Sequence, residues 1–275
     1  MSLFITSLNS GSNGNCYYIG NETEAILIDA GISCGEIVKR IKRLGLNIET
    51  VKAVFISHEH SDHINGIQVL SKKYQIPVFI TDTTLSCCRL KLEKHLVTSF
   101  DPHRPVTIGN ITVTAFPKHH DAADPYSFII SSSEVKVGVF TDIGVPCKHV
   151  IHHFKQCNAA FLETNYDDTM LEKGRYPFYL KNRIRSDKGH LSNQQALELF
   201  TRNRPPFMSH LFLSHISKNN NCPDIVQQLF DTHADGVKMI VASRYQETPV
   251  YQISYSNYRL PEPRRLVSTQ LSFSF

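Results

Sequence analysis

The sequence predicts an α/β fold, and three observations lead to this class. Strand-like segments open the chain, and further along they alternate with amphipathic helical segments. Of the 275 residues, 41% are hydrophobic and 20% are charged, as is typical of globular proteins. A chain of this length can bury roughly three quarters of its surface without disulfides or structural metals. These features exclude a disordered chain and a disulfide-stapled mini-domain.

The opening segment, up to Gly31, predicts a β-meander with tight turns. Short apolar runs of β-prone residues at 3–8, 16–19 and 25–28 indicate strands. The small and polar stretch 10–15 separates the first two strands and predicts a turn.

The rest of the chain alternates between helices and strands. A helix is expected over 35–44, where Ile37, Ile41 and Leu44 fall at helical spacing. The further helices are expected over 64–74, over 193–201 with Ser192 as its N-cap, and over 223–233. The further strands are expected over 52–57, 77–81, 111–116, 126–131, 135–141, 158–163, 210–214 and 250–255. We interpret the whole chain, 1–275, as one domain with a basic insertion at about 168–188 and a C-terminal arm at about 259–275.

Hydropathy, charge and cysteine content exclude further classes. No run approaches the roughly 18 apolar residues of a membrane-spanning helix, and the N-terminus lacks the features of a secretion signal. The seven cysteines are an odd number without a C-x-x-C pair, so we expect reduced thiols and a cytoplasmic location. The net charge of +4 permits a polyanionic partner without requiring one.

The strongest pattern is the run His58-Glu59-His60-Ser61-Asp62-His63, directly after the expected strand 52–57. Imidazole and carboxylate groups are good ligands for first-row divalent metals. Because alternate residues of an extended turn can point the same way, we expect His58 and His60 to bind one ion. Asp62 and His63 would then face a second ion. Two ions about 3.5–4 Å apart can share a hydroxide and contact both the attacking and the leaving oxygen of a substrate.

Further ligands are expected at the ends of other strands. His120 follows 111–116, Asp142 follows 135–141, and His215 follows 210–214. Ligands gather at the carboxyl ends of strands in α/β proteins, which favours a common site for the three. The neighbouring His119 is an alternative to His120.

These residues resemble the motifs of the metallo-β-lactamase superfamily over most of the chain. Asp29 resembles the first motif, the run 58–63 the second, and His120, Asp142 and His215 the third to fifth. The resemblance implies a four-layer αβ/βα sandwich that holds two divalent ions, with Asp142 bridging them and Asp29 orienting the ligands. Zinc is the expected metal for so many histidines, and manganese, iron or nickel are alternatives.

Longer stretches resemble the YycJ/WalJ-like family within that superfamily. They are 10–15, His120-Asp121-Ala122, 162–167, 186–193 and 214–220. The match around His120 favours this residue over His119. Ser214 departs from the family pattern, which has glycine before the histidine. The resemblance implies an exonuclease that degrades double-stranded DNA from the 5′ end.

Glu163 and His190 resemble a carboxylate–histidine pair that lies outside the metal ligands in tRNase Z and β-CASP nucleases. A carboxylate beside an imidazole favours the protonated imidazole, which can protonate the leaving oxygen of a phosphodiester. We therefore predict Asp62, Glu163 and His190 as catalytic residues. The alternative is that Glu163 is a capping or salt-bridge residue and that His190 belongs to a helix start.

The insertion holds six Lys or Arg residues over 172–188, together with three aromatic residues. Basic groups bind phosphates, and aromatic rings can stack on bases. The predicted substrate contacts are Lys181, Arg183, Arg185, Lys188, and Asn15 in the turn 10–15, a turn that could cradle an anion. The alternatives are a solvated helical face for the insertion and a plain tight turn for 10–15.

The predicted function is a binuclear metal-dependent hydrolase that cleaves phosphodiester bonds, most favourably in double-stranded DNA. A small-molecule phosphodiesterase or thioester hydrolase with the same metal site is the main alternative. A non-catalytic scaffold is disfavoured because all seven predicted ligands are present, and a lactamase because the chain shows no export signal. The oligomeric state is left open.

Overall fold

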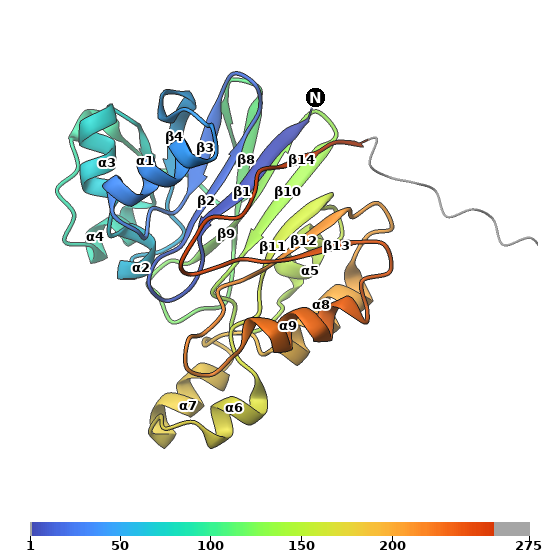
Figure 1. Ribbon diagram of the computed structural model, residues 1–275. Coiled ribbons are helices and arrows are strands. Elements are labelled where there is room, and N and C mark those ends of the chain that lie inside the picture. The colour runs from blue at the N-terminus through green and yellow to red at the C-terminus, as the bar shows by residue number, and fades with distance from the viewer. Residues whose placement is uncertain (1, 256–275) are drawn as a thin grey trace, which may run out of the picture.

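The structure, a computed structural model, describes residues 2–255 and contains two seven-stranded sheets (Figure 1). The first sheet has the order β14-β1-β2-β3-β4-β5-β6, and the second the order β13-β12-β11-β10-β9-β8-β7. The strands of the first sheet are β1 (Leu3–Asn9), β2 (Cys16–Gly20), β3 (Ala25–Ile28), β4 (Val51–Phe55), β5 (Val78–Phe79), β6 (Val97–Thr98) and β14 (Tyr251–Ile253). Those of the second are β7 (Pro105–Ile108), β8 (Ile111–Pro117), β9 (Tyr126–Ser132), β10 (Val135–Phe140), β11 (Ala159–Glu163), β12 (His210–Ser214) and β13 (Lys238–Val241). The predicted C-terminal arm at 259–275 lies outside the described residues.

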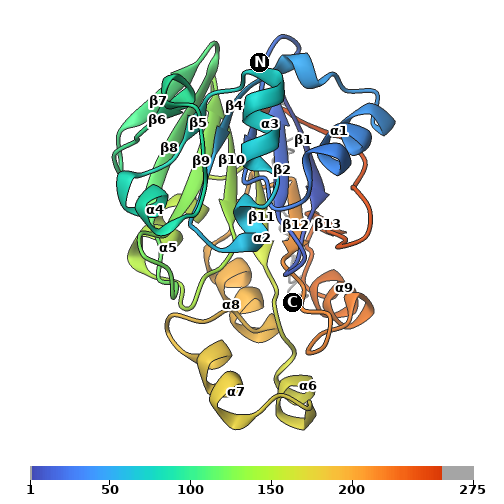
Figure 2. The same cartoon turned by 90° about the vertical axis from the view of Figure 1, so that its left-hand side faces the viewer.

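Helices cover the outer face of each sheet, as the two views show (Figure 1, Figure 2). The helices on the first sheet are α1 (Cys34–Arg43) and α3 (Ile67–Tyr74), and those on the second are α5 (Lys148–Phe154), α8 (Asn193–Asn203) and α9 (Pro223–Asp231). The other α-helices are α2 (Ser61–Ile64), α4 (Asp82–Cys87), α6 (Asp168–Lys173) and α7 (Phe178–Arg185). Within the described part, no helix is both long and apolar enough to cross a membrane. The predicted four-layer α/β sandwich is confirmed.

The main core lies between the inner faces of the two sheets. Phe55 stacks on Phe79 with ring centroids 4.5 Å apart, and Phe161 contacts Phe212 at the same distance. Phe128 of the second sheet packs edge-on against Phe55 of the first, at 5.9 Å. Each buried phenylalanine contributes about 1.5–3 kcal/mol relative to an exposed one, so this layer fixes the sheets against each other.

The helix expected over 64–74 is interrupted, and Gly66 explains why. The structure has α2 and α3 there, with Gly66 between them. The Gly66 amide donates to the Ala30 carbonyl at 2.8 Å, and a Cβ at this position would lie 2.0 Å from the Ile32 carbonyl oxygen. The close approach of the 30–32 loop therefore separates the two helices.

Several other elements differ from the expectation. The strand expected over 77–81 is only β5, Val78–Phe79. The sequence reading also missed several short elements, namely β6, β7, β13, α4 and α5. The insertion 168–188 forms two helices, α6 and α7, which lie apart from the sandwich in both views (Figure 1, Figure 2). The predicted N-cap Ser192 forms a complete capping box with Gln195 at the start of α8.

The central strands of both sheets run parallel and end at one edge. In the first sheet β3, β4, β5 and β6 pair in parallel, and in the second β10, β11, β12 and β13 do so. The amide of Tyr126 donates to the Ser57 carbonyl at 3.0 Å and joins the two sheets at this edge. Side chains that follow these strands therefore converge from both sheets.

Candidate metal centre

The predicted ligands come together at the carboxyl edge of the two sheets. One group of ligand atoms belongs to His58, His60 and His120, a second to His58, His63 and Asp142, and a third to Asp142, Glu163, His190 and His215. Within each group the atoms lie within 4.8 Å of one another. Asp62 completes the set, because its Oδ2 lies 3.6 Å from His63 Nε2 and 3.7 Å from His215 Nε2. Neutral imidazoles and carboxylates in this arrangement fit a divalent metal.

The backbone is unusual at three of these positions. Asp29, Asp142 and His215 have positive φ values of 62°, 55° and 54°. Non-glycine residues adopt this left-handed conformation at a cost of about 1–3 kcal/mol, and such residues cluster at functional sites. Local hydrogen bonds hold two of them: the amide of Asp29 donates to the Phe55 carbonyl at 2.9 Å, and that of His215 donates to Ser10 Oγ at 2.7 Å.

Asp142 occupies the centre of the cluster and has a free carboxylate oxygen. Its Oδ2 is buried and makes no hydrogen bond within residues 2–255, although His63 Nε2 lies 3.2 Å away. Burial alone would raise the pKa of Asp142, but the charges of His215 and His63 outweigh burial and hold it well below its usual value. A buried, ionised oxygen without a donor is suited to a metal ion.

Asp29 supports the ligands from behind. Its Oδ2 accepts hydrogen bonds from His63 Nδ1 at 2.7 Å and from Ser57 Oγ at 2.8 Å, and its Oδ1 accepts from the Ser57 amide at 2.8 Å. Ser57 Oγ also lies 2.9 Å from His58 Nδ1. Because Nδ1 of His63 is held by Asp29, its Nε2 faces the cluster, as is usual for a metal-binding histidine. Ser57, which the sequence reading passed over, is part of this support.

Asn15 lies against the ligands and is fully buried. Its Nδ2 lies 3.3 Å from Asp62 Oδ2 and 3.2 Å from His63 Nε2, and its Oδ1 accepts from the Gly11 amide at 3.0 Å. The side chain thus connects the turn 10–15 to the metal ligands. Its role as a substrate contact stays a prediction.

His120, and not His119, belongs to the cluster. His120 is buried, and its Nδ1 donates to the Gly189 carbonyl at 3.1 Å, which leaves Nε2 for the cluster. His119 is exposed, and its carbonyl accepts from the Gly144 amide at 2.8 Å. Burial lowers the pKa of His120 to about 3, so its neutral, ligating form is favoured.

Glu163 contacts both His190 and His215. Its Oε1 lies 2.7 Å from His190 Nδ1 and 3.0 Å from His215 Nδ1, and its Oε2 accepts from the Ile143 amide at 2.7 Å. Burial would raise the pKa of Glu163, but the charge and hydrogen bond of His190 and the hydrogen bond of His215 lower it to about 2. The structure thus brings together the two residues of the predicted pair, with an ionised carboxylate holding the imidazole.

A buried ammonium group also lies at the site, and the sequence reading missed it. Lys118 is buried at the end of the segment that leads to His120, and its Nζ donates to the Thr141 carbonyl at 2.7 Å. Burial lowers the pKa of Lys118, and the carboxylates of Asp142 and Asp29 oppose that shift. The signal in the sequence was the position of Lys118, two residues after the strand predicted over 111–116 and two residues before the predicted ligand His120.

Three of the six basic residues of the insertion make contacts within the protein. Arg183 pairs with Asp121, Arg185 Nη2 lies 2.6 Å from Glu172 Oε2, and Lys181 donates to the Glu172 carbonyl. Lys188 is exposed. Of the aromatic residues in the insertion, Phe178 and Tyr179 are 77% and 74% exposed, while Tyr176 packs on a small core under α6 and α7.

Comparison with known proteins assigns the family. The profile of the Beta-lactamase superfamily domain matches residues 24–216. The chain is 33% identical over 249 residues to Exodeoxyribonuclease YycJ of Bacillus anthracis, covering 86% of this chain and 92% of that protein. It is 30% identical over 226 residues to Exodeoxyribonuclease WalJ of Streptococcus pneumoniae, covering 79% of this chain and 83% of that protein. The metallo-β-lactamase fold protein YhfI from Bacillus subtilis matches with a TM-score of 0.72 at 18% identity, covering 92% of this chain and 100% of that chain. The chain therefore belongs to the β-lactamase superfamily and, within it, to the group of the YycJ and WalJ proteins.

Proposed function

We propose that this chain is a metal-dependent nuclease that degrades double-stranded DNA from the 5′ end in the cytoplasm, with 1–275 acting as one domain. The observation that carries the proposal is the contact between Glu163 and His190 beside the cluster of metal-binding side chains. An imidazole held in this way suits the protonation of a poor leaving group such as the alkoxide of a phosphodiester. The YycJ and WalJ relatives are named exodeoxyribonucleases, which supports the choice of DNA.

The site fits two divalent ions, and zinc suits its many histidines. His58, His60 and His120 would hold one ion, and Asp62, His63 and His215 the other, with Asp142 between them. Ions bound there supply the positive charge that activates water near neutral pH and neutralises the phosphoryl oxygens. The buried Oδ2 of Asp142, which accepts no hydrogen bond within residues 2–255, would be available to such ions.

The protein's own residues then move the protons. Glu163 holds Nδ1 of His190, so that Nε2 can give a proton to the leaving oxygen. Asp62 has 21% of its side chain exposed, more than Asp142 at 2% or Glu163 at 0%. Of these three carboxylates it is the one most open to the attacking water, and we assign it the role of proton acceptor. His190, with 22% of its side chain exposed, is likewise open to a substrate.

The lobe formed by α6 and α7 is proposed to contact the DNA. Phe178 and Tyr179 are exposed there and can stack on bases or sugars. The exposed Lys188 can contact a phosphate directly, whereas Lys181, Arg183 and Arg185 would need to exchange their present partners. The lobe thus offers aromatic and basic groups beside His190.

A comparison of leaving groups tests the proposal. The substrates are a 5′-phosphorylated duplex with a 3′-end label and bis(p-nitrophenyl) phosphate, whose leaving group needs no protonation. With His190→Ala we expect kcat on the duplex to fall by about 10²–10⁴-fold, and hydrolysis of the small diester to change far less. Glu163→Gln should also lower kcat on the duplex more than hydrolysis of the small diester, but by a smaller factor than His190→Ala.

Equal losses on both substrates would contradict the role of His190 as the acid. No cleavage of the duplex by the wild type, with hydrolysis of the small diester intact, would favour a small-molecule phosphodiesterase instead.

A further inference from the structure

A cavity of about 200 Å³ lies beside the metal centre, outside the residues assigned above. It lies between the segment that follows His215 and the loop that follows β13. Its lining includes Ser10, Ile216, Pro223, Val241, Arg244 and Tyr245. Ser10 Oγ accepts a hydrogen bond from the His215 amide at 2.7 Å, so the wall of the cavity is continuous with a predicted metal ligand.

The cavity has mainly apolar walls and an exposed aromatic ring at its rim. Ile216, Pro223 and Val241 supply apolar surface, and Tyr245 is 69% exposed. Flat rings bind between apolar walls and aromatic faces, and nucleobases do so with little regard to their identity. Pockets for drug-sized ligands measure about 300–1,000 Å³, so this smaller cavity suits one ring system.

The charge of the lining is positive. Among residues 2–255, Arg244 and Lys218 are the only ionised residues that line it, and no carboxylate does so. Nη1 of Arg244 is buried and has no hydrogen-bond partner in the part of the chain that is described. An unsatisfied buried donor is costly, and a guanidinium group matches the oxygens of a phosphate. The ligand that completes this lining is therefore an anion.

The loop that carries these residues is held in place by other parts of the fold. The Ser10 amide donates to the Ser243 carbonyl at 3.1 Å, and Asn13 Nδ2 donates to the Arg244 carbonyl at 2.9 Å. Nη2 of Arg40, which is itself buried, donates to the Tyr245 carbonyl at 3.2 Å. A fixed loop loses little freedom when a ligand binds, which favours a preformed site.

We infer that this cavity binds the base of a nucleotide next to the scissile bond, with Tyr245 stacking on the base and Arg244 contacting a phosphate of the same strand. The inference rests on the proposed function and names the part of the substrate that this side of the site recognises. Because stacking tolerates every base, the site is expected to bind without sequence preference.

Binding of a single nucleotide tests the inference without cleavage. The probe is deoxyadenosine 5′-monophosphate, measured by titration calorimetry on the metal-loaded protein, and 2-deoxyribose 5-phosphate serves as the probe without a base. Tyr245→Ala should weaken binding of the nucleotide about tenfold, the size of one stacking contact, and leave the sugar phosphate unchanged. Arg244→Ala should weaken both probes, and Tyr245→Phe should bind as the wild type does.

Two controls keep the outcome clear. Arg89→Ala, an exposed arginine in the loop after α4, should bind both probes as the wild type does. Each variant should hold as much metal per chain as the wild type in elemental analysis, which shows an intact metal centre. Equal affinity of the wild type, Tyr245→Ala and Arg244→Ala for the nucleotide would overturn the inference. Nucleotide binding that depends on Tyr245, in a protein that does not cleave DNA, would refute the proposed nuclease and support the nucleotide site.

Discussion

The guanidinium group of Arg183 pairs with the carboxylate of Asp121, the residue that directly follows His120. His120 in turn donates to the carbonyl of Gly189, just beyond the predicted insertion. Two contacts thus connect the insertion and the residue that follows it to the metal centre: the ion pair of Arg183 with Asp121 and the hydrogen bond from His120 to Gly189. A change in α7 can therefore reach a metal ligand without any contact to substrate.

Arg183→Ala is expected to lower kcat/KM by the same factor on duplex DNA and on a small diester. The factor should be about two- to fivefold, because the pair is partly exposed and such pairs contribute up to about 1 kcal/mol. Steady-state kinetics of Arg183→Ala, Asp121→Asn and the double variant measure the coupling, and the double variant should lose no more than either single variant. A loss confined to DNA would instead show that Arg183 contacts the DNA directly.

The exposed cations of the insertion should carry the electrostatic affinity for DNA. Lys173, Arg175 and Lys188 are exposed and form no ion pair within the described range 2–255. Replacing all three by alanine should weaken duplex binding about tenfold or more. The slope of the logarithm of the binding constant against the logarithm of the salt concentration should become shallower by about 0.9 for each lost phosphate contact. Hydrolysis of the small diester should be unchanged. Filter binding over a series of salt concentrations measures both quantities.

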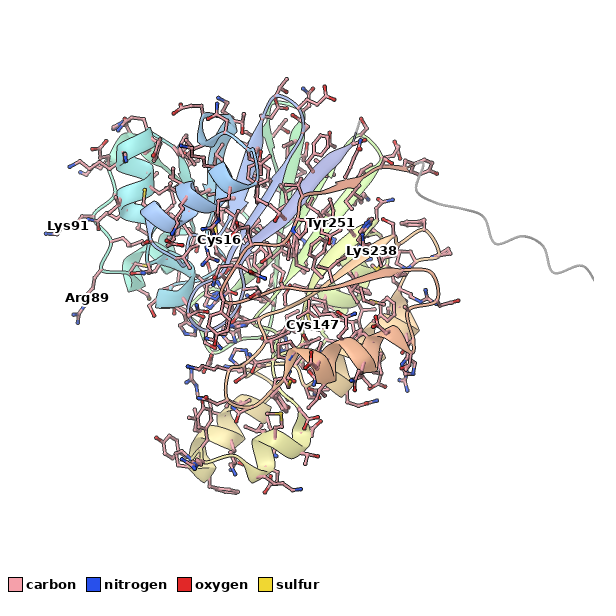
Figure 3. The ribbon with its side chains drawn as sticks, viewed as in Figure 1. Cys16, Arg89, Lys91, Cys147, Lys238 and Tyr251 are labelled. Atoms are coloured by element: carbon pink, nitrogen blue, oxygen red, sulfur yellow. The ribbon has the colours of Figure 1, made fainter. Side chains whose placement is uncertain are left out.

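A matched charge control comes from another part of the surface. Arg89 and Lys91 project into solvent from the loop after α4, far from α6 and α7 in the view (Figure 3). Removing these two charges should leave the slope of affinity against salt unchanged. If removing Arg89 and Lys91 changes the slope as much as removing the three insertion cations does, the DNA lies over a different face.

The positions of the site residues at the ends of strands could be predicted from the sequence, because a histidine or an acidic residue stands at or directly after an apolar run. On that basis His58, His60, His63, Asp142 and His215 are predicted at one site, and the structure brings these side chains together. Their roles as metal ligands stay a prediction. The ion pair of Arg183 with Asp121 could not be predicted from the sequence, because the two residues are 62 positions apart and belong to different elements. The short strand β13 was missed because it begins with an exposed lysine and is only partly buried, whereas β3, also of four residues, is wholly apolar and was predicted.

Acid should remove a small part of the stability that Glu24 provides. Its Oε1 accepts from Asn21 Nδ2 at 2.8 Å and from the Asn110 amide at 2.6 Å, and its Oε2 accepts from Thr23 Oγ1 at 2.6 Å. Hydrogen bonds from Thr23 and Asn21 are the main reason that the pKa of Glu24 is lowered from 4.5 to about 2. Because the pKa is lowered on folding, the contribution is complete above about pH 4.5 and is lost as the pH falls towards 2.

Glu24→Gln should therefore destabilise the protein at neutral pH by less than about 1 kcal/mol, since solvent screens this partly exposed group. Denaturant unfolding at a series of pH values should show the difference from the wild type narrowing below about pH 4.5. A difference that stays constant down to pH 3 would contradict the assignment to ionised Glu24.

Two glycines are expected to respond to alanine in opposite ways. Gly66→Ala would place a methyl group 2.0 Å from the Ile32 carbonyl oxygen, so it should destabilise the protein by about 1–3 kcal/mol. Gly35 lies inside α1, and a Cβ added there would meet nothing within 4 Å among the described residues, so Gly35→Ala should stabilise the protein by about 0.5–1 kcal/mol. Thermal unfolding of the two variants measures both effects, and a neutral Gly66→Ala would contradict the close packing of the 30–32 loop.

The most direct measurement is the digestion of a 5′-phosphorylated, 3′-end-labelled DNA duplex by the metal-reconstituted protein, followed on a denaturing gel. Asp142→Ala and a chelator-treated sample serve as controls, because Asp142 lies at the centre of the ligand cluster. We predict that the wild type alone gives progressively shorter labelled fragments, as cleavage from the 5′ end requires. An uncut duplex under conditions in which the same preparation hydrolyses bis(p-nitrophenyl) phosphate would contradict the proposed nuclease.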